Sequence, residues 1–329
     1  MKIRKLNQEE KQQTKPLYQR IFHEDSESFV DYYYSEKTKD NTIYIVEEDG
    51  IRSMLHLNPY MIRVNGKEEP AHYIVAVATE KDFRKRGYMT ALLKTALRDM
   101  YAAGEPFTFL MPAAEEIYLP HGFSTVYEQN QRYLTNREAA GQGFRPARQA
   151  DAPAMAVFAE TFLRDHYQVY AKRDCFYYER LMREYESDGG FLAVREQDGK
   201  ITDIRPCVDE TPAAEARIMV RAVHVKRLLL LLGLNYLTAV CFRVTDPYIE
   251  ENNQVFMVTG TEYSGVMLME GRPENSEGTL PVDALTKLVF GAATVDEIAA
   301  RKDVVMTERM GRELEKIVPL SHIWLNEIV

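Results

Sequence analysis

One segment constrains the fold more than any other. An apolar strand, His72 to Ala78, is followed by the basic loop Arg84-Lys85-Arg86-Gly87-Tyr88 and then by a helix. The helix is predicted because apolar residues recur at spacings of three and four, at Met89, Leu92, Leu93, Ala96, Leu97 and Met100. Gly104 ends the helix, and a short apolar strand over residues 106–111 follows. A strand, helix and strand in this order predict parallel pairing of the two strands.

The basic loop lies where an anion could bind. The first N–H groups of a helix have no partner within the helix, and they lie at the positive end of its dipole. They can therefore hold a phosphate group, and Gly87 would let the backbone approach it closely. Arg84, Lys85 and Arg86 add positive charge. A solvated basic turn is the simpler interpretation of the loop taken alone.

The segments before this unit predict a helix and antiparallel strands. Residues 8–22 are typical of a helix, and residues 42–47 alternate as a strand before the turn Glu48-Asp49-Gly50. Two extended segments, 53–57 and 60–64, precede the turn Asn65-Gly66. Tyr32-Tyr33-Tyr34 is expected to pack in the core, with a substrate channel as the alternative.

The segments after this unit suggest two boundaries. A short helix is expected over 114–118 and a strand or hairpin over 124–134, before a boundary near Gly141-Gln142-Gly143. Residues 144–178 mainly indicate helix, and a hairpin is expected at Asp198-Gly199. The second boundary falls in 204–214, where the pattern is weak and includes two prolines. Beyond it we expect one helix that ends at residue 233, a second over 282–290, and a third that begins with the cap Thr294. Strands are expected at 237–244, 255–259 and 266–269.

Composition excludes several classes of function. The net charge of −9, with no long basic block, argues against nucleic acid as a partner. The most apolar run, 228–242, is interrupted and shorter than the ~20 residues of a membrane span. Because the first ten residues are charged and carry no signal-like stretch, we expect a cytoplasmic protein. The seven histidines have no metal-ligand spacing, so no metal is expected, and free buried thiols are expected at Cys175, Cys207 and Cys241.

Residues 1–135 resemble the GNAT acetyltransferases, whose acetyl-CoA motif is a strand, then R/Q-x-x-G-x-G/A, then a helix. Arg84 to Gly87 match this motif, while Met89 stands where a small residue is usual. The same departure is similar to the Eis-type branch, in which R-R-R-G is followed by larger residues. The resemblance implies that acetyl-CoA is the co-substrate and that its pyrophosphate binds at Arg84, Lys85, Arg86, Gly87 and Tyr88.

Two further segments are similar to Eis elements: residues 76–79, and residues 117–123, in which His121 replaces the usual aromatic residue. By this resemblance Tyr118 protonates the departing coenzyme A thiolate, and Val77 and Thr79 present main-chain groups to the pantetheine arm. A tyrosine packed beneath the sheet for structural reasons is the alternative. Asp25 stands where Eis-like proteins have acidic residues lining the amine pocket, although a solvated acid at a helix end is the more common case.

Residues 213–329 resemble the sterol-carrier-protein-like domain that ends Eis proteins. In that family the terminal carboxylate folds back into the active site, which implies that Val329 supplies the base. A terminal strand that completes a sheet is the alternative for the apolar segment Trp324 to Val329. Residues 142–212 occupy the place of the family's second GNAT region, at reduced length.

Together these patterns predict an α/β (α+β) protein with a catalytic GNAT acetyltransferase domain at 1–141, a shortened second GNAT-like region at 142–212 and a sterol-carrier-protein-like domain at 213–329. The resemblance implies an N-acetyltransferase that acts on an aminoglycoside-like or lysine-like primary amine by direct attack. It also implies a homo-oligomer, since family members are often hexamers. A non-catalytic protein that binds coenzyme A or another small molecule and retains the fold is the alternative.

Overall fold

A long antiparallel hairpin organises the first sheet. Strands β3 (Ile51–Val64) and β4 (Lys67–Thr79) are joined by Asn65-Gly66, where both residues have positive φ, 47° and 80°. This is the conformation of a type I′ turn, which matches the twist of the flanking strands. The two extended segments expected before this turn are one continuous strand. The computed structural model describes residues 2–129, 131–208 and 216–327.

The first sheet combines strands from distant parts of the chain. β4 and β5 are parallel, as predicted, but β11 lies between β5 and β6 and is antiparallel to both. β11 comes from beyond the second expected boundary, so the sheet of the first region includes a segment of the third. The spatial order is β1 (Lys2–Lys5), β2 (Thr42–Glu47), β3, β4, β5 (Phe107–Leu110), β11 (Arg217–Ala222) and β6 (Ser124–Glu128).

Helices cover both faces of this sheet. α3 (Tyr88–Ala102) buries the predicted apolar face, including Leu92, Leu93 and Ala96, against Tyr44 and Val46 of β2. α1 (Lys15–Ile21) and α2 (Glu27–Glu36) pack on the other face, against Ile43 and Ile45. The predicted core placement of Tyr32, Tyr33 and Tyr34 is confirmed, because all three side chains are buried. The helix expected over 8–22 begins as a 3-10 helix, Gln8–Thr14, before α1.

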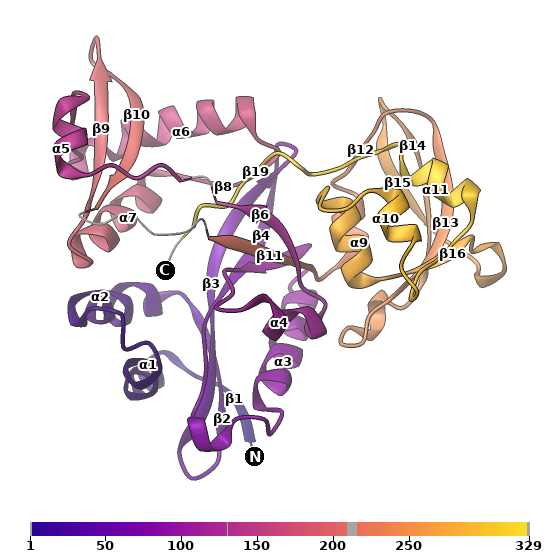
Figure 1. Cartoon of the computed structure of the whole chain (residues 1–329), viewed down its shortest axis with the longest axis horizontal. Helices are drawn as coiled ribbons and strands as arrows, with labels where there is room; N and C mark the ends of the chain where they lie inside the picture. The colour runs from indigo at the N-terminus through magenta and orange to yellow at the C-terminus, as the bar shows by residue number, and fades with distance from the viewer. Residues whose placement is uncertain (1, 130, 209–215, 328–329) are drawn as a thin grey trace.

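The middle region forms its own small sheet from β7, β9 and β10, with helices beside it (Figure 1). The hairpin at Asp198-Gly199 is confirmed. The helical expectation for 144–178 is wrong at the strands β7 (Phe144–Pro146) and β8 (Val169–Ala171). The strand β10 (Lys200–Cys207) extends into the segment 204–214, where a boundary was expected. Cys175 is exposed at the start of α7, contrary to expectation, whereas Cys207 and Cys241 are buried. The elements are α5 (Asn136–Gly141), β7 (Phe144–Pro146), α6 (Ala152–His166), β8 (Val169–Ala171), α7 (Cys175–Ser187), β9 (Phe191–Gln197) and β10 (Lys200–Cys207).

The C-terminal region packs helices against a mixed sheet with the order β15-β14-β13-β16-β17. Thr294 forms the predicted capping box with Glu297. Its strands are β13 (Thr238–Thr245), β14 (Val255–Thr261), β15 (Gly265–Glu270), β16 (Gly278–Pro281) and β17 (Val305–Met306), and a separate pair is β12 (Gly233–Leu234) with β18 (Ile317–Val318). Its helices are α8 (Val225–Leu229), α9 (Val282–Val289), α10 (Val295–Ala299) and α11 (Glu308–Leu314).

The last strand returns to the first two regions. β19 (Ile323–Trp324) pairs in parallel with β8, and β8 pairs with the far end of β3 (Figure 1). The segment that includes β19 therefore lies between the first sheet and the middle region rather than with the C-terminal sheet. Among residues 2–129, 131–208 and 216–327, no helix combines the length and apolar character needed to cross a membrane.

Candidate active site

A bulge near the carboxyl end of β4 interrupts its pairing with β3. Met54 pairs with Ala78 and His56 pairs with Val75, so Ala76 and Val77 together face the single residue Leu55. Ala76 has φ of +50°, which non-glycine residues rarely adopt. A bulge takes the extra residue out of the ladder and bends the strand. The main chain at Val77 is therefore placed to present groups to something other than β3.

The sheet opens beside this bulge. β4 and β5 are aligned as ladder partners only at Tyr73 and Phe109, and the rings of these two residues stack at 5.1 Å. Beyond that pair β4 continues for six residues without pairing to β5. The carboxyl ends of parallel strands are the usual place for a ligand in open α/β sheets.

The basic loop lies at the N-terminus of α3, beyond the end of β4. Arg84, Lys85, Arg86 and Gly87 are exposed, and Gly87 has φ of +79°. A Cβ added at Gly87 would meet nothing within 4 Å, so there is open space in front of the first turn of the helix. Free N–H groups at this helix end, three nearby cations and open space together suit an anion such as pyrophosphate.

Side chains of the loop are held by contacts within it. Arg84 Nε donates to the Thr79 carbonyl at 3.2 Å, and Arg86 Nη2 donates to the Asp82 carbonyl at 2.9 Å. The buried Tyr88 donates to Glu48 at 2.5 Å, so its side chain anchors the helix start to the β2–β3 turn. The Tyr88 hydroxyl, which belongs to a residue predicted to bind pyrophosphate, is thus already used in the contact with Glu48.

Tyr118 ends the short helix α4 (Glu115–Tyr118) and is only 8% exposed. Its ring meets Phe123 edge to face at 5.8 Å. Burial raises the pKa of Tyr118 to about 12, so the hydroxyl is protonated at neutral pH. Burial also raises the pKa of Tyr73, and Tyr118 contributes to that increase, so the two tyrosines are electrostatic neighbours at the point where β4 and β5 diverge.

Asp25 lies between α1 and α2, and its carboxylate accepts a hydrogen bond of 2.7 Å from Tyr18. Burial raises the pKa of Asp25, and the charges of Asp188 and Glu24 add to this effect. Tyr18 belongs to the α1 and α2 side of the sheet, whereas Tyr118 belongs to the α3 side. The structure therefore does not bring Asp25 into contact with Tyr118.

Residues 325–327 are bound by Tyr127, which lies in β6, and by Gln129, which follows it. Gln129 Nε2 donates to the carbonyls of Leu325 and Glu327, at 3.1 and 3.3 Å. The Tyr127 hydroxyl donates to Asn326 Oδ1 at 2.7 Å. Asn326 and Glu327 are buried. Ile328 and Val329 lie outside the described residues, and so does the expected position of the Val329 carboxylate.

Glu327 is a site residue that the sequence interpretation missed. It forms an ion pair of 3.0 Å with Arg173 and accepts a hydrogen bond of 2.5 Å from Tyr177. After burial, Glu327 is the next cause that raises the pKa of Tyr60, and it also raises that of Tyr73. The carboxylate is thus an electrostatic neighbour of both tyrosines. In the sequence, the one feature that could have indicated Glu327 is that it is the single acid among the last, largely apolar residues.

A cavity of about 170 Å³ lies beside Glu327, between β3, α7 and the turn that follows α2. Its wall includes the buried ion pair of Lys37 with Glu184, at 2.5 Å. Acids and bases alternate around it, and aromatic rings complete the lining: Asp40, Asp174, Lys172, Arg180, Tyr60, Phe176 and Tyr177. In the part of the chain that the structure describes, no group of three or more His, Cys, Asp or Glu side chains could hold a metal ion.

Two family models match the chain. Residues 2–126 match the acetyltransferase (GNAT) domain, and residues 225–326 match the sterol carrier protein domain. The first match includes the bulge, the basic loop and Tyr118. No curated protein sequence is significantly similar to the chain.

Solved structures resemble the chain over nearly its whole length. A GCN5-related N-acetyltransferase from Anabaena variabilis has a TM-score of 0.74 at 14% identity, covering 98% of this chain and 99% of that one. One from Kribbella flavida has a TM-score of 0.73 at 15% identity, covering 99% and 100%. Eis1 from Mycobacterium abscessus has a TM-score of 0.67 at 14% identity, covering 96% and 97%. At these identities the likeness establishes a shared fold over the length of the chain.

Proposed function

We propose that this chain, which carries a GNAT acetyltransferase domain followed by a sterol carrier protein domain, transfers the acetyl group of acetyl-CoA to a primary amine. One observation carries the proposal: the bulge at Val77 lies where β4 and β5 diverge, the basic loop follows the carboxyl end of β4, and the buried Tyr118 follows the carboxyl end of β5. Transfer of an acetyl group from a thioester cofactor requires a site that binds the pyrophosphate, main-chain groups that bind the rest of the cofactor, and a general acid.

The residues present fit acetyl-CoA. The first N–H groups of α3, with Arg84, Lys85 and Arg86, would hold the pyrophosphate in the open space at Gly87. The main chain of Val77 and Thr79, at and after the bulge, would hold the pantetheine arm. The arm would then lead from the loop toward Tyr118.

The chemistry is a direct transfer. The neutral amine attacks the thioester carbonyl, the new C–N bond forms and the C–S bond breaks. Tyr118 gives its proton to the departing sulfur, and the amine loses a proton to a base. The raised pKa of Tyr118, caused by burial, keeps this proton in place until the sulfur accepts it. No nucleophilic cysteine or serine takes part in this scheme.

We assign the base to the α-carboxylate of Val329. Support comes from the preceding residues, because Gln129, Tyr127 and Arg173 hold residues 325–327 between the first sheet and the middle region. Glu327 already binds Arg173 and Tyr177, so it acts as the anchor of the tail rather than as the base. A partly buried carboxylate beyond this anchor would have a raised pKa and could accept a proton from an ammonium group.

The amine would enter from the cavity beside Glu327. Aminoglycoside-like and lysine-like amines remain the proposed classes on the family resemblance, since cations as well as carboxylates line the cavity and its charge alone does not select a cation. Asp25 is not part of the wall of this cavity, and with Asp188 it would add to the attraction of a cation approaching the loop between α1 and α2.

The test is thiol release from acetyl-CoA with kanamycin, spermidine and lysine ethyl ester as acceptors. We expect turnover with at least one amine. Adding a short peptide to the C-terminus should abolish turnover while leaving acetyl-CoA binding and thermal unfolding unchanged, and the same peptide at the N-terminus is the matched control. Binding without turnover on any amine would favour the non-catalytic alternative, and full turnover with the C-terminal peptide would exclude the Val329 carboxylate as base.

A further inference from the structure

A fully buried ion pair joins the first sheet to the C-terminal region. Arg221 belongs to β11, and Asp246 follows β13. Their side chains have no exposed surface, and Arg221 Nη2 donates to Asp246 Oδ1 at 2.6 Å. Apolar residues of similar size often replace such a pair without loss of stability, so burial of two charges is weak evidence for a stabilising role.

Arg221 also donates to the main chain at two points. Nη1 donates to the carbonyl of its neighbour Ala222 at 2.8 Å, and Nε donates to the carbonyl of His121 at 2.8 Å. A guanidinium is planar and rigid, so groups bound to its different edges are held in a defined relative geometry. Arg221 thus fixes the position of His121 with respect to Asp246.

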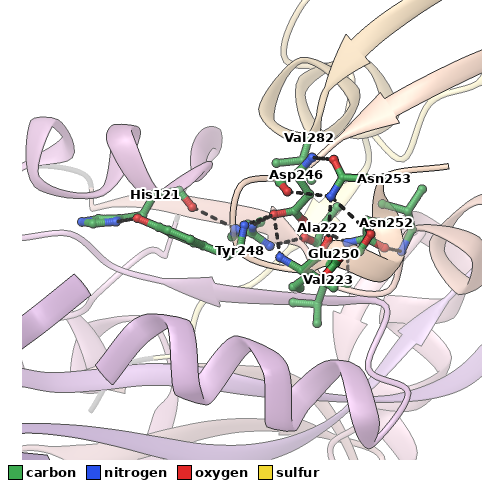
Figure 2. Close-up of polar contacts among 12 residues, drawn as sticks. His121, Ala222, Val223, Asp246, Tyr248, Glu250, Asn252, Asn253 and Val282 are labelled. Carbon is green, nitrogen blue, oxygen red and sulfur yellow. Dashed lines mark hydrogen bonds and ion pairs between the residues drawn. The ribbon is translucent and has the colours of Figure 1, made fainter. Parts of the chain in front are cut away.

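Asp246 is itself held by groups other than Arg221, as Figure 2 shows. Its Oδ1 accepts from the main-chain N–H groups of Tyr248 and Ile249, at 2.8 and 3.1 Å. Its Oδ2 accepts from Asn252 at 2.9 Å, and Asn252 also donates to the carbonyl of Val223 at 2.8 Å. The carboxylate is therefore a fixed reference point in the C-terminal region.

His121 is held a second time through its ring. Its Nδ1 lies 2.5 Å from the Tyr248 hydroxyl, and the two rings stack at 5.7 Å (Figure 2). The ring of His121 thus contacts Tyr248 directly, and its main chain is linked to Asp246 through Arg221. The histidine that departs from the expected aromatic residue at this position thus makes a specific polar contact.

His121 and Tyr118 belong to the same compact turn. Residues Leu119–His121 form a 3-10 turn directly after Tyr118, and Gly122 N–H closes it on the Leu119 carbonyl at 3.1 Å. Gly122 has φ of +81°, and a Cβ there would come within 3.1 Å of Arg221 Nε. Phe123, the next residue, packs against the Tyr118 ring. A shift of His121 would therefore shift Tyr118.

We propose that Arg221 and Asp246 are positioning residues that hold the Tyr118 hydroxyl in line with the departing sulfur, acting through His121. The inference rests on the proposed function, in which Tyr118 is the acid. It gives the C-terminal region a second role besides carrying the tail, because its Asp246 segment sets the geometry of the acid in the first region.

The test is Arg221→Lys, which keeps the positive charge for Asp246 but removes the Nε donor to His121. Small displacements of a catalytic group can cost up to about 100-fold in rate, so we expect kcat to fall about 10- to 100-fold, with the KM for acetyl-CoA unchanged. Tyr248→Phe removes only the hydroxyl contact to His121 and should also lower kcat. It provides the test if Arg221→Lys does not fold. Arg301→Lys is the matched control, since Arg301 pairs with Asp283 within the C-terminal region.

The deciding measurement repeats both variants in a Tyr118→Phe background. A residue that acts through Tyr118 has nothing left to position, so neither variant should lower kcat further. An additional loss of the same size in that background would overturn the inference while leaving the role of Tyr118 intact. If Tyr118→Phe alone retains full activity, the proposed acid is wrong and the inference falls with it.

Discussion

Arg173 Nη2 lies 3.0 Å from Glu327 Oε1, although the two residues are 154 positions apart. Arg173 precedes α7 of the middle region, and Glu327 belongs to the tail that follows β19. The side chain of Glu327 is 2% exposed, so the pair is shielded from water and from salt. The contact fastens the tail next to the cavity and to the tyrosines of the first sheet.

Arg173→Met should detach this tail. The variant leaves the buried Glu327 without its cation, which typically costs about 3–5 kcal/mol in the free energy of unfolding. We also expect kcat to fall, because the tail carries the proposed base. Urea unfolding and thiol release measure the two effects. Arg164→Met removes an exposed pair with Asp165 and should change the free energy of unfolding by less than about 1 kcal/mol. Equal unfolding midpoints for the two variants would contradict the anchoring role.

Acetyl-CoA should stabilise the fold through the basic loop. At about 100 times the Kd, a ligand adds about 2.7 kcal/mol, which corresponds to a melting shift of several degrees. Arg84→Glu combined with Arg86→Glu should remove the shift, because the pyrophosphate would meet negative charge. Lys226→Glu combined with Lys302→Glu makes the same charge change at exposed sites of the C-terminal region and should keep it. A shift no larger than that produced by adenosine would show that the cofactor assignment is wrong.

Tyr118→Phe should lower kcat by about 10²–10⁴-fold, since a general acid contributes this much to the transition state. The ring remains against Phe123, so the affinity for acetyl-CoA should hardly change. Steady-state kinetics on the best amine, together with a melting curve in acetyl-CoA, separate the two quantities. Tyr101→Phe, at the far end of α3, is the matched control. Undiminished turnover would remove Tyr118 from the mechanism.

The pH dependence of kcat should lack an alkaline decline. Burial raises the pKa of Tyr118 from its ordinary value near 10 to about 12, so the acid keeps its proton as the pH rises through 10. The rate should increase as the amine loses its proton and then stay level to pH 10.5. A tyrosine with the ordinary pKa of ~10 would lose about three-quarters of its protonated form by that pH. Such a decline, reversible on return to pH 8, would contradict the raised pKa.

His56 should make the fold sensitive to mild acid. It is fully buried, accepts or donates a hydrogen bond of 3.0 Å with the Tyr33 hydroxyl, and burial lowers its pKa to about 3. Between pH 6.5 and the lowered pKa of about 3, the unfolded chain takes up a proton at His56 and the folded chain does not. The contribution of His56 to the free energy of unfolding is therefore complete above pH 6.5 and is lost as the pH falls below it. From pH 7 to pH 5 one such group removes about 2 kcal/mol.

The measurement is urea unfolding at pH 7 and pH 5 for the wild type and His56→Gln. His121 and His224 also have lowered pKa values through burial, and they are unchanged in the variant. The difference between the two proteins therefore reports on His56. We expect the variant to lose less stability on acidification, and equal losses would disprove the prediction.

Local patterns predicted much of the first region and one hairpin of the middle region. The spacing of apolar residues identified α3 and its buried face, and turn residues identified the hairpins at Asn65-Gly66 and Asp198-Gly199. These features depend on neighbours in the sequence, which periodicity and turn chemistry describe. The middle region was harder, because β7 and β8 have three residues each and are too short to show alternation.

The candidate site was only partly accessible from sequence. The basic loop and Tyr118 stand in recognisable motifs, whereas the role of Glu327 depends on Arg173 and Tyr177, about 150 residues away. Such partners are chosen by the tertiary fold, and no local pattern indicates them. The bulge at Ala76 and Val77 is similar, because it is defined by the register with β3 rather than by its own residues.

The position of β11 bears on how the protein is made. Residues 217–222 fill the gap between β5 and β6, so both of those strands have an unpaired edge until this segment has left the ribosome. A nascent chain that has emerged only to residue 141 can form the β3–β4 hairpin but cannot finish its first sheet. The acetyltransferase domain therefore completes its folding late in synthesis, when part of the C-terminal region is already available, and a fragment cut near residue 141 should aggregate through its open edges.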